Sequence, residues 1–177
     1  WRMIEPMVSD LFKVEEQGLF YSILPTATQY ARNALFAGMM PGDIEKRFPG
    51  KWLSEDAEGS KNAHEEEFMV EQLKRLGKGV KSSYHKITNL AAGKKLAENI
   101  GNLMDNSFNA IVYNFVDMLS HARTEMEIIR ELAQDEAAYR SITLSWFKHS
   151  PLLDMLRTIA EKGGRVVITT DHGTVRV

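Results

Sequence analysis

The side chains best suited to chemistry fall in three short clusters, at residues 26–28, 117–121 and 171–173. The first cluster holds two threonine hydroxyls. The second holds an aspartate and a histidine four positions apart, and the third an adjacent Asp-His pair followed by glycine. Carboxylate and imidazole groups bind zinc or manganese, and a bound metal ion can activate a hydroxyl as a nucleophile. The three clusters together therefore indicate metal-assisted nucleophilic chemistry.

The threonine cluster lies between a predicted strand at 19–24 and a predicted helix that ends at Gly38. Thr26 and Gln29 have the spacing of a capping box, with Thr26 as N-cap. Thr28 then falls in the first helical turn, where free backbone N–H groups can hold an anion beside its hydroxyl. A threonine placed there becomes a nucleophile if a metal ion lowers the pKa of its hydroxyl. The alternative is that both threonines only cap the helix.

The two Asp/His clusters follow predicted strands at 109–116 and 165–170. Asp117 and His121 supply one hard carboxylate and one imidazole to a metal, although such pairs are also common on helix surfaces. Asp171 and His172 can address one ligand only where the backbone turns sharply, which Gly173 makes easier. Alternatively, Asp171 only caps a turn in which His172 is exposed.

Strand and helix patterns alternate along the chain, which predicts an α/β fold with helices on both sides of a mixed sheet. A fourth strand is expected at 80–87. Because ligands gather beyond the carboxyl ends of strands in such sheets, we expect the three clusters to form one site. The expected helices are at residues 1–16, 24–38, 63–76, 90–104, 125–147 and 151–162, with a loop at 39–61 that contains a helical turn near 43–47.

Composition excludes several classes of protein. The 177 residues contain no cysteine, which removes disulfides, thiolate metal sites, iron–sulfur clusters and a cysteine nucleophile. A formal charge of −2 and a pI near 6.2 argue against a general nucleic-acid coating protein. No apolar run approaches the roughly 20 residues of a membrane helix, so no membrane partner is expected.

The order of the three clusters resembles the alkaline phosphatase superfamily, in which two metal ions flank a Ser or Thr nucleophile. Residues 25–41 contain P-T-A-T and later G-M-M-P, which look like the P-T-x-T…G-x-x-P pattern of the nucleotide pyrophosphatase/phosphodiesterase branch. That match implies that Thr28 is the nucleophile. Residues 24–38 are more similar still to PglZ domains. The whole chain, including 114–121, is similar to PglZ effector domains of response regulators associated with type IX secretion.

The resemblance implies a three-layer α/β/α fold with inserted helices and two metal sites, most simply for Zn²⁺, with Mn²⁺ as an alternative. It implies that Asp117 and His121 bind one metal together with a later histidine. It further implies that Asp171 and His172 join Thr28 and an earlier aspartate, either sharing one metal or divided between the two. The two additional ligands are expected outside this chain, which we interpret as a PglZ domain cut at both ends.

Three further residues are candidates for substrate binding. The pyrophosphatase branch has an asparagine three positions beyond its nucleophile, where this chain has Ala31, and Arg32 or Asn33 could substitute for it. His149 follows an aromatic and a cationic residue and could contact a base or a phosphate. Alternatively, His149 only ends a helix that carries a buried tryptophan nearby.

The resemblance predicts a metal-dependent phosphodiesterase for nucleotide-like or oligonucleotide phosphodiesters. It also predicts an upstream receiver domain, a sensor kinase and signalling proteins as partners, a cytoplasmic location and a homodimer as one possible state. The alternative is a non-catalytic output module with the same fold that acts through protein contacts. A phosphatase or phosphomutase of the same superfamily is a third possibility, recognisable by its preference for monoesters.

Overall fold

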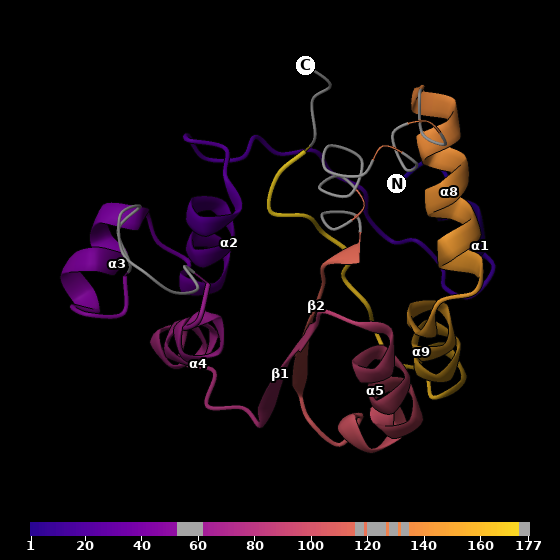
Figure 1. The fold of residues 1–177 in the computed structure, drawn as a ribbon. Helices are drawn as coiled ribbons and strands as arrows, with labels where there is room; N and C mark the ends of the chain where they lie inside the picture. Colours follow the sequence, from indigo (N-terminus) through magenta and orange to yellow (C-terminus); the bar gives the residue numbers. More distant parts are fainter. Residues whose placement is uncertain (53–61, 116–118, 120–126, 128–130, 132–134, 174–177) are drawn as a thin grey trace. The chain divides into compact units, whose positions relative to one another are not determined.

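The computed structural model describes residues 1–52, 62–115, 119, 127, 131 and 135–173 (Figure 1). The chain forms two compact units. The α/β unit consists of Trp1–Gln17 and Ser83–Val166, and the helical unit of Gly18–Ser82 and Val167–Val177. The chain therefore leaves the α/β unit after its first helix and returns to it at the first strand.

The α/β unit is built around two paired strands, β1 (Ser82–Ile87) and β2 (Phe108–Tyr113). The helix α5 (Leu90–Leu103) connects them, and such a crossover connection joins parallel strands. Beyond the end of β2, the N–H of Asn114 donates to the carbonyl oxygen of Ile87 at 3.3 Å. The remaining helices of this unit are α1 (Glu5–Ser9), α8 (Glu136–Lys148) and α9 (Pro151–Glu161).

Local sequence signals explain where α5 and α9 begin. The Asn89 side chain accepts a hydrogen bond from the N–H of Ala92, and Ser150 caps α9, whose first residue is a proline. The two helices pack against each other (Figure 1). The apolar core that they share with the strands is formed by Ile87, Leu96, Ile100 and Met155.

Two glycines of α5 are expected to respond oppositely to alanine. A Cβ atom at Gly93 would lie 2.6 Å from the hydroxyl oxygen of Tyr113, whose ring packs against Trp146, so Gly93→Ala is expected to cost about 1–3 kcal/mol. A Cβ atom at Gly101 would meet only the far end of the Lys162 side chain, so Gly101→Ala is expected to stabilise the helix by up to about 1 kcal/mol. Urea unfolding of both variants measures the two shifts, and equal shifts would contradict this packing.

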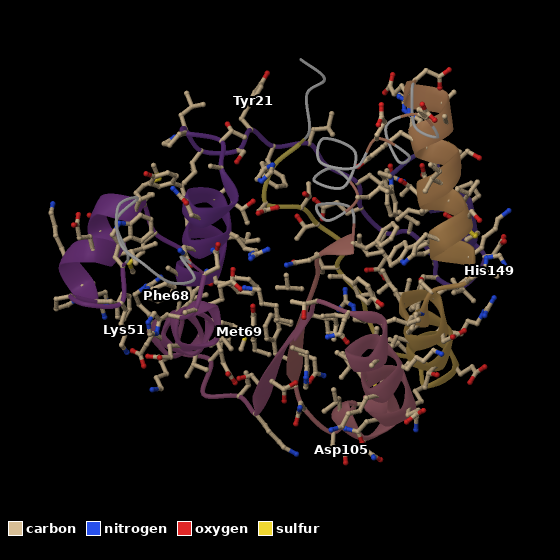
Figure 2. The ribbon with its side chains drawn as sticks, in the orientation of Figure 1. Tyr21, Lys51, Phe68, Met69, Asp105 and His149 are labelled. Carbon is tan, nitrogen blue, oxygen red and sulfur yellow. The ribbon has the colours of Figure 1, made fainter. Side chains whose placement is uncertain are left out.

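The helical unit consists of α2 (Thr28–Ala37), α3 (Pro41–Arg47) and α4 (Glu65–Arg75). Helix α2 packs against both of the others. It ends at Gly38, whose φ of 58° lies in the left-handed region that favours glycine. Phe68 is fully buried in the core of this unit, 5.2 Å from Phe48 between ring centroids (Figure 2). Ala37 and Ile44 complete the buried cluster.

The helices predicted at 24–38, 63–76, 90–104 and 151–162 and the strands predicted at 80–87 and 109–116 are confirmed, with shifted ends. The first helix is only five residues long rather than spanning 1–16. Of the residues predicted helical at 125–147, Glu127 and Glu131 are helical, and α8 begins at Glu136. The helical turn expected near 43–47 is α3. Among the described residues, no helix is both long and apolar enough to cross a membrane.

The strands predicted at 19–24 and 165–170 are wrong, because neither segment forms a β-ladder with the residues that the structure describes. Both segments lack regular secondary structure instead. Leu19, Tyr21 and Val167 are almost completely exposed, and Tyr21 projects away from the ribbon (Figure 2). β-branched and aromatic residues favour a half-buried pleated surface, but a strand also needs a hydrogen-bonded neighbour, which composition does not supply.

Candidate active site

Thr28 is the first residue of α2, and its N-cap is Ala27 in an extended conformation. The prediction that Thr26 caps this helix is wrong, because α2 has no side-chain cap and the Thr26 hydroxyl donates to the carbonyl oxygen of Ile23 at 3.3 Å. The helix begins one residue later than the capping-box spacing predicts. Thr28 nevertheless lies in the first turn as predicted, at the positive end of the helix dipole.

The Thr28 hydroxyl meets the imidazole of His172, with 3.0 Å between Oγ1 and Nε2. The other ring nitrogen, Nδ1, lies 2.9 Å from the carbonyl oxygen of Gly173, which can only accept a hydrogen bond. Nδ1 therefore carries the proton, and in the neutral ring Nε2 accepts the hydrogen bond that Thr28 donates. A ring whose Nδ1–H is held by a backbone carbonyl presents its Nε2 lone pair as a base or a metal ligand.

Asp171 adds a carboxylate beside this pair. Its Oδ1 atom accepts a hydrogen bond from the N–H of His172 at 3.2 Å. Its Oδ2 atom is buried without a hydrogen-bond partner among the described residues and lies 3.8 Å from Nε2 of His172. A buried carboxylate oxygen without a donor carries a desolvation cost of about 1–3 kcal/mol or more, which a cation at this position would remove.

Thr28 Oγ1, His172 Nε2 and Asp171 Oδ2 are donor atoms of the kinds that a divalent metal ion binds. Ligands of a tetrahedral zinc ion at bond lengths near 2.0–2.1 Å are separated by about 3.3 Å, which the two distances of 3.0 and 3.8 Å bracket. Nitrogen and oxygen donors of this kind also suit manganese. The structure thus places Thr28, Asp171 and His172 side by side, and their role as metal ligands stays a prediction.

Two hydrogen bonds from outside the cluster position its backbone. The Ser22 hydroxyl donates to the carbonyl oxygen of Asp171 at 2.9 Å, so the segment before α2 anchors the Asp-His turn. The Asn62 side-chain amide donates to the carbonyl oxygen of Thr28 at 3.4 Å from the residues before α4. Sequence analysis missed both residues, because a lone serine and a lone asparagine carry no motif that points to a partner far along the chain.

Arg32 and Asn33, the predicted substrate-binding residues of α2, have other contacts. The Nε atom of Arg32 pairs with the carboxylate of Glu65, whose side chain is only 1% exposed, whereas that of Arg32 is 12% exposed. Asn33 is buried, and its side-chain amide donates to the carbonyl oxygen of Gln29 at 2.8 Å. Glu65 is the first of three successive glutamates, a pattern that by itself predicts a solvated helix start. That prediction is wrong for Glu65, because α4 turns this residue toward α2.

The remaining predicted site residues lie in the α/β unit or outside the described residues. His149 ends α8 in the α/β unit, where its Nδ1 donates to the carbonyl oxygen of Ser145 at 2.9 Å (Figure 2). Asp117 and His121 lie outside the described residues. Within the described part of the chain, no group of three or more His, Cys, Asp or Glu side chains could hold a metal ion. The described cluster thus offers two such side chains and the Thr28 hydroxyl.

The described structure combines a strand–helix–strand unit with a hydroxyl-imidazole-carboxylate cluster at a helix start. Comparison with family models shows the class of protein, because the model described as "BREX system PglZ alkaline phosphatase-like domain" matches residues 2–177. The chain therefore belongs to the PglZ family. None of the curated proteins compared with the chain matches it.

Proposed function

We propose that this chain is a metal-dependent phosphodiesterase that acts on nucleotide-like or oligonucleotide phosphodiesters, with Thr28 as its nucleophile. The observation that carries the proposal is the hydrogen bond from the Thr28 hydroxyl to His172, beside a buried carboxylate oxygen of Asp171 that has no donor among the described residues. Membership of an alkaline phosphatase-like family supports a phosphoester as the substrate.

Thr28, His172 and Asp171 would hold the metal ion, which would supply positive charge to ionise the hydroxyl and to balance the phosphoryl oxygens. Thr28 Oγ1 forms a bond to phosphorus while the bond between phosphorus and the alcohol oxygen breaks, and the alcohol leaves after taking up a proton. Water then attacks phosphorus in the resulting threonine phosphodiester, which still carries the second ester group of the substrate, and the bond from phosphorus to Thr28 Oγ1 breaks. This second step releases a phosphomonoester and restores the threonine hydroxyl, so one water is consumed for each diester bond.

Arg32 is the residue of α2 best placed to contact the phosphoryl oxygens. It lies four positions after Thr28, which puts both residues on one face of the helix. Helical side chains lean toward the N-terminus, so the Arg32 side chain would run back toward the turn that contains Thr28. Pairing of its Nε atom with the buried Glu65 fixes the orientation of the guanidinium plane.

Removal of metal tests the proposal most directly. Hydrolysis of bis-p-nitrophenyl phosphate is expected to stop in excess chelator and to return when Zn²⁺ or Mn²⁺ is restored. The Asp171→Asn variant keeps the shape of the side chain and removes its charge. It is expected to need about 10- to 100-fold more metal for half-maximal rate, in the range found when groups around a metal site are altered. Release of p-nitrophenolate, followed by its absorbance under stepwise metal addition, measures both effects.

Three results would contradict this assignment. Turnover that is unaffected by the chelator would remove the metal from the mechanism. A folded protein that binds zinc but hydrolyses no diester would favour the alternative of a non-catalytic output module that acts through protein contacts. A preference for p-nitrophenyl phosphate over the diester would point instead to a monoesterase or phosphomutase.

We further propose, from the sequence resemblance, that the domain forms a three-layer α/β/α fold and binds two zinc ions, with Asp117 and His121 at the second. The same resemblance supports a role as output domain of a cytoplasmic response regulator linked to type IX secretion, with a sensor kinase as a partner and a homodimer as one possible state. His149 and Asn33 remain candidates for substrate binding under this proposal.

A further inference from the structure

A concave surface of the helical unit lies at the end of α2 opposite Thr28. This cavity has a volume of about 500 Å³. It is formed where the end of α2 meets α3 and the end of α4. We call it the basic pocket, and its lining residues are Gly38, Met39, Asp43, Lys46, Arg47 and Arg75.

Three cations and one carboxylate line the basic pocket, so its charge is predominantly positive. Lys46 and Arg47 are exposed, and neither makes a hydrogen bond or an ion pair with the residues that the structure describes. Arg75 reaches the pocket from a different helix. Its Nη2 atom donates to the carbonyl oxygens of Ala37 and Gly38 at 2.7 and 3.2 Å, which holds its guanidinium group in place.

The surroundings do not cancel this positive charge. The nearby Glu71 is already paired with Lys74 at 2.7 Å. The pKa of Glu71 is lowered, first by the hydrogen bond from Lys74 and further by the charges of Arg47 and Lys51. The positive charge of Arg47 therefore acts on Glu71 as well as on the pocket. Placement at a helix C-terminus favours a cation, both at the end of α3 and for Arg75 beside the last carbonyls of α2, and the pocket gathers these charges in one place.

We propose that the basic pocket binds a second phosphate group of a single-stranded oligonucleotide whose scissile phosphate lies at Thr28. This inference rests on the proposed function and names its substrate class more closely. The ten residues of α2 separate the two places by about 15 Å. At roughly 3.4 Å per nucleotide, the rise along a stacked strand, that span corresponds to about four nucleotides, and an unstacked strand covers it with fewer. An oligonucleotide of six residues therefore reaches the pocket, whereas a dinucleotide does not.

Binding of labelled oligothymidylates to the protein with zinc present tests the inference. Fluorescence anisotropy is measured with fluorescein-labelled hexathymidylate and dithymidylate. The Lys46→Ala/Arg47→Ala variant is expected to bind the hexamer about tenfold more weakly and the dimer less than about twofold more weakly, because only the hexamer is long enough to place a phosphate beside these two cations. The salt dependence of hexamer binding should also fall, by about 0.7 in logarithmic slope for each phosphate that the variant no longer neutralises.

Two further variants keep the test specific. Lys94→Ala/Lys95→Ala removes the same charge from the exposed face of α5 in the other unit and is expected to leave the hexamer affinity within about twofold. Asp43→Asn removes the one carboxylate of the pocket and is expected to tighten hexamer binding about twofold. Equal losses in the two lysine-containing double variants would reflect general attraction between charges and would overturn the inference, as would a hexamer affinity that neither pocket variant changes.

The outcomes for the pocket and for the proposed function are separable. Diester hydrolysis combined with hexamer binding that is insensitive to Lys46 and Arg47 would overturn the pocket and leave the phosphodiesterase assignment intact. Hexamer binding that depends on these two residues, in a protein that hydrolyses no diester, would support the pocket and overturn the enzyme assignment.

Discussion

Replacing Thr28 by valine is expected to lower the rate of diester hydrolysis at saturating metal by at least about a thousandfold, as the loss of other nucleophiles does. Valine has nearly the same shape and is also β-branched, so α2 keeps its first residue and the variant is expected to fold. The oxygen that would bond to phosphorus is gone, however, and so is the hydrogen bond to Nε2 of His172. Initial rates with bis-p-nitrophenyl phosphate measure the change in kcat.

Thr26→Val provides the matched control for this variant. Thr26 lies two residues earlier, is exposed, and donates only to the carbonyl oxygen of Ile23. Its replacement removes the same hydroxyl group from the same turn and is expected to change the rate by less than about threefold, because an exposed hydrogen bond of this kind is worth about 0.5 kcal/mol. Similar losses in both variants would assign the effect to the fold of the turn and would refute Thr28 as nucleophile.

Isolation of the intermediate adds evidence that rates alone do not give. Acid quenching during turnover of a ³²P-labelled dinucleotide is expected to leave label on the wild-type chain and none on the Thr28→Val chain. Label retained by the valine variant would mean that another residue attacks phosphorus. Absence of label from both chains, together with unimpaired turnover, would favour direct attack by water.

The helices of this chain are predictable because their signals are local. The apolar spacing of α5 and α9, the caps Asn89 and Ser150, and the glycine after α2 all act within a few residues. The segments at 19–24 and 165–170 are mispredicted for the opposite reason. A strand needs a hydrogen-bonded neighbouring strand that is distant in sequence. The pattern of side chains within one segment cannot reveal whether such a neighbour is present.

The candidate site shows the same division between local and distant information. Thr28, Asp171 and His172 are predictable because each belongs to a short recognisable pattern, and the structure places the three together. Ser22, which positions one side of this cluster, has no such pattern. Glu65 is mispredicted because three successive glutamates at a helix start indicate a solvated face, and only the packing of α4 on α2 shows which one is buried.

The buried carboxylate of Glu65 is the basis of the second prediction, which concerns the stability of the fold. Replacing Arg32 by methionine keeps most of the side-chain stem but removes the guanidinium group that pairs with Glu65, whose side chain is only 1% exposed. Breaking a buried ion pair from one side is expected to lower the free energy of unfolding by about 3 kcal/mol, because the remaining charge is still desolvated. Urea unfolding followed by circular dichroism measures the loss.

An exposed ion pair on α8 provides the matched control for the stability cost of breaking the buried pair. Arg140 and Glu136 form the same type of ion pair, but their side chains are 55% and 71% exposed. Arg140→Met is therefore expected to cost less than about 0.5 kcal/mol. A loss at Arg32 as small as that at Arg140 would mean that Glu65 reaches water or takes up a proton in the variant, and would remove the ion pair as a constraint on α2.

The double variant Arg32→Met/Glu65→Leu separates the structural role of the pair from a role in substrate binding. Removing both charges is expected to restore most of the lost stability, because no uncompensated charge remains between α2 and α4. If Arg32 also contacts the phosphoryl oxygens, kcat/KM for the diester stays at least about tenfold below that of the wild type in this restabilised protein. Recovery of both stability and kcat/KM would assign Arg32 to the architecture of the helical unit alone and leave charge balance at the phosphate to the metal site at Thr28.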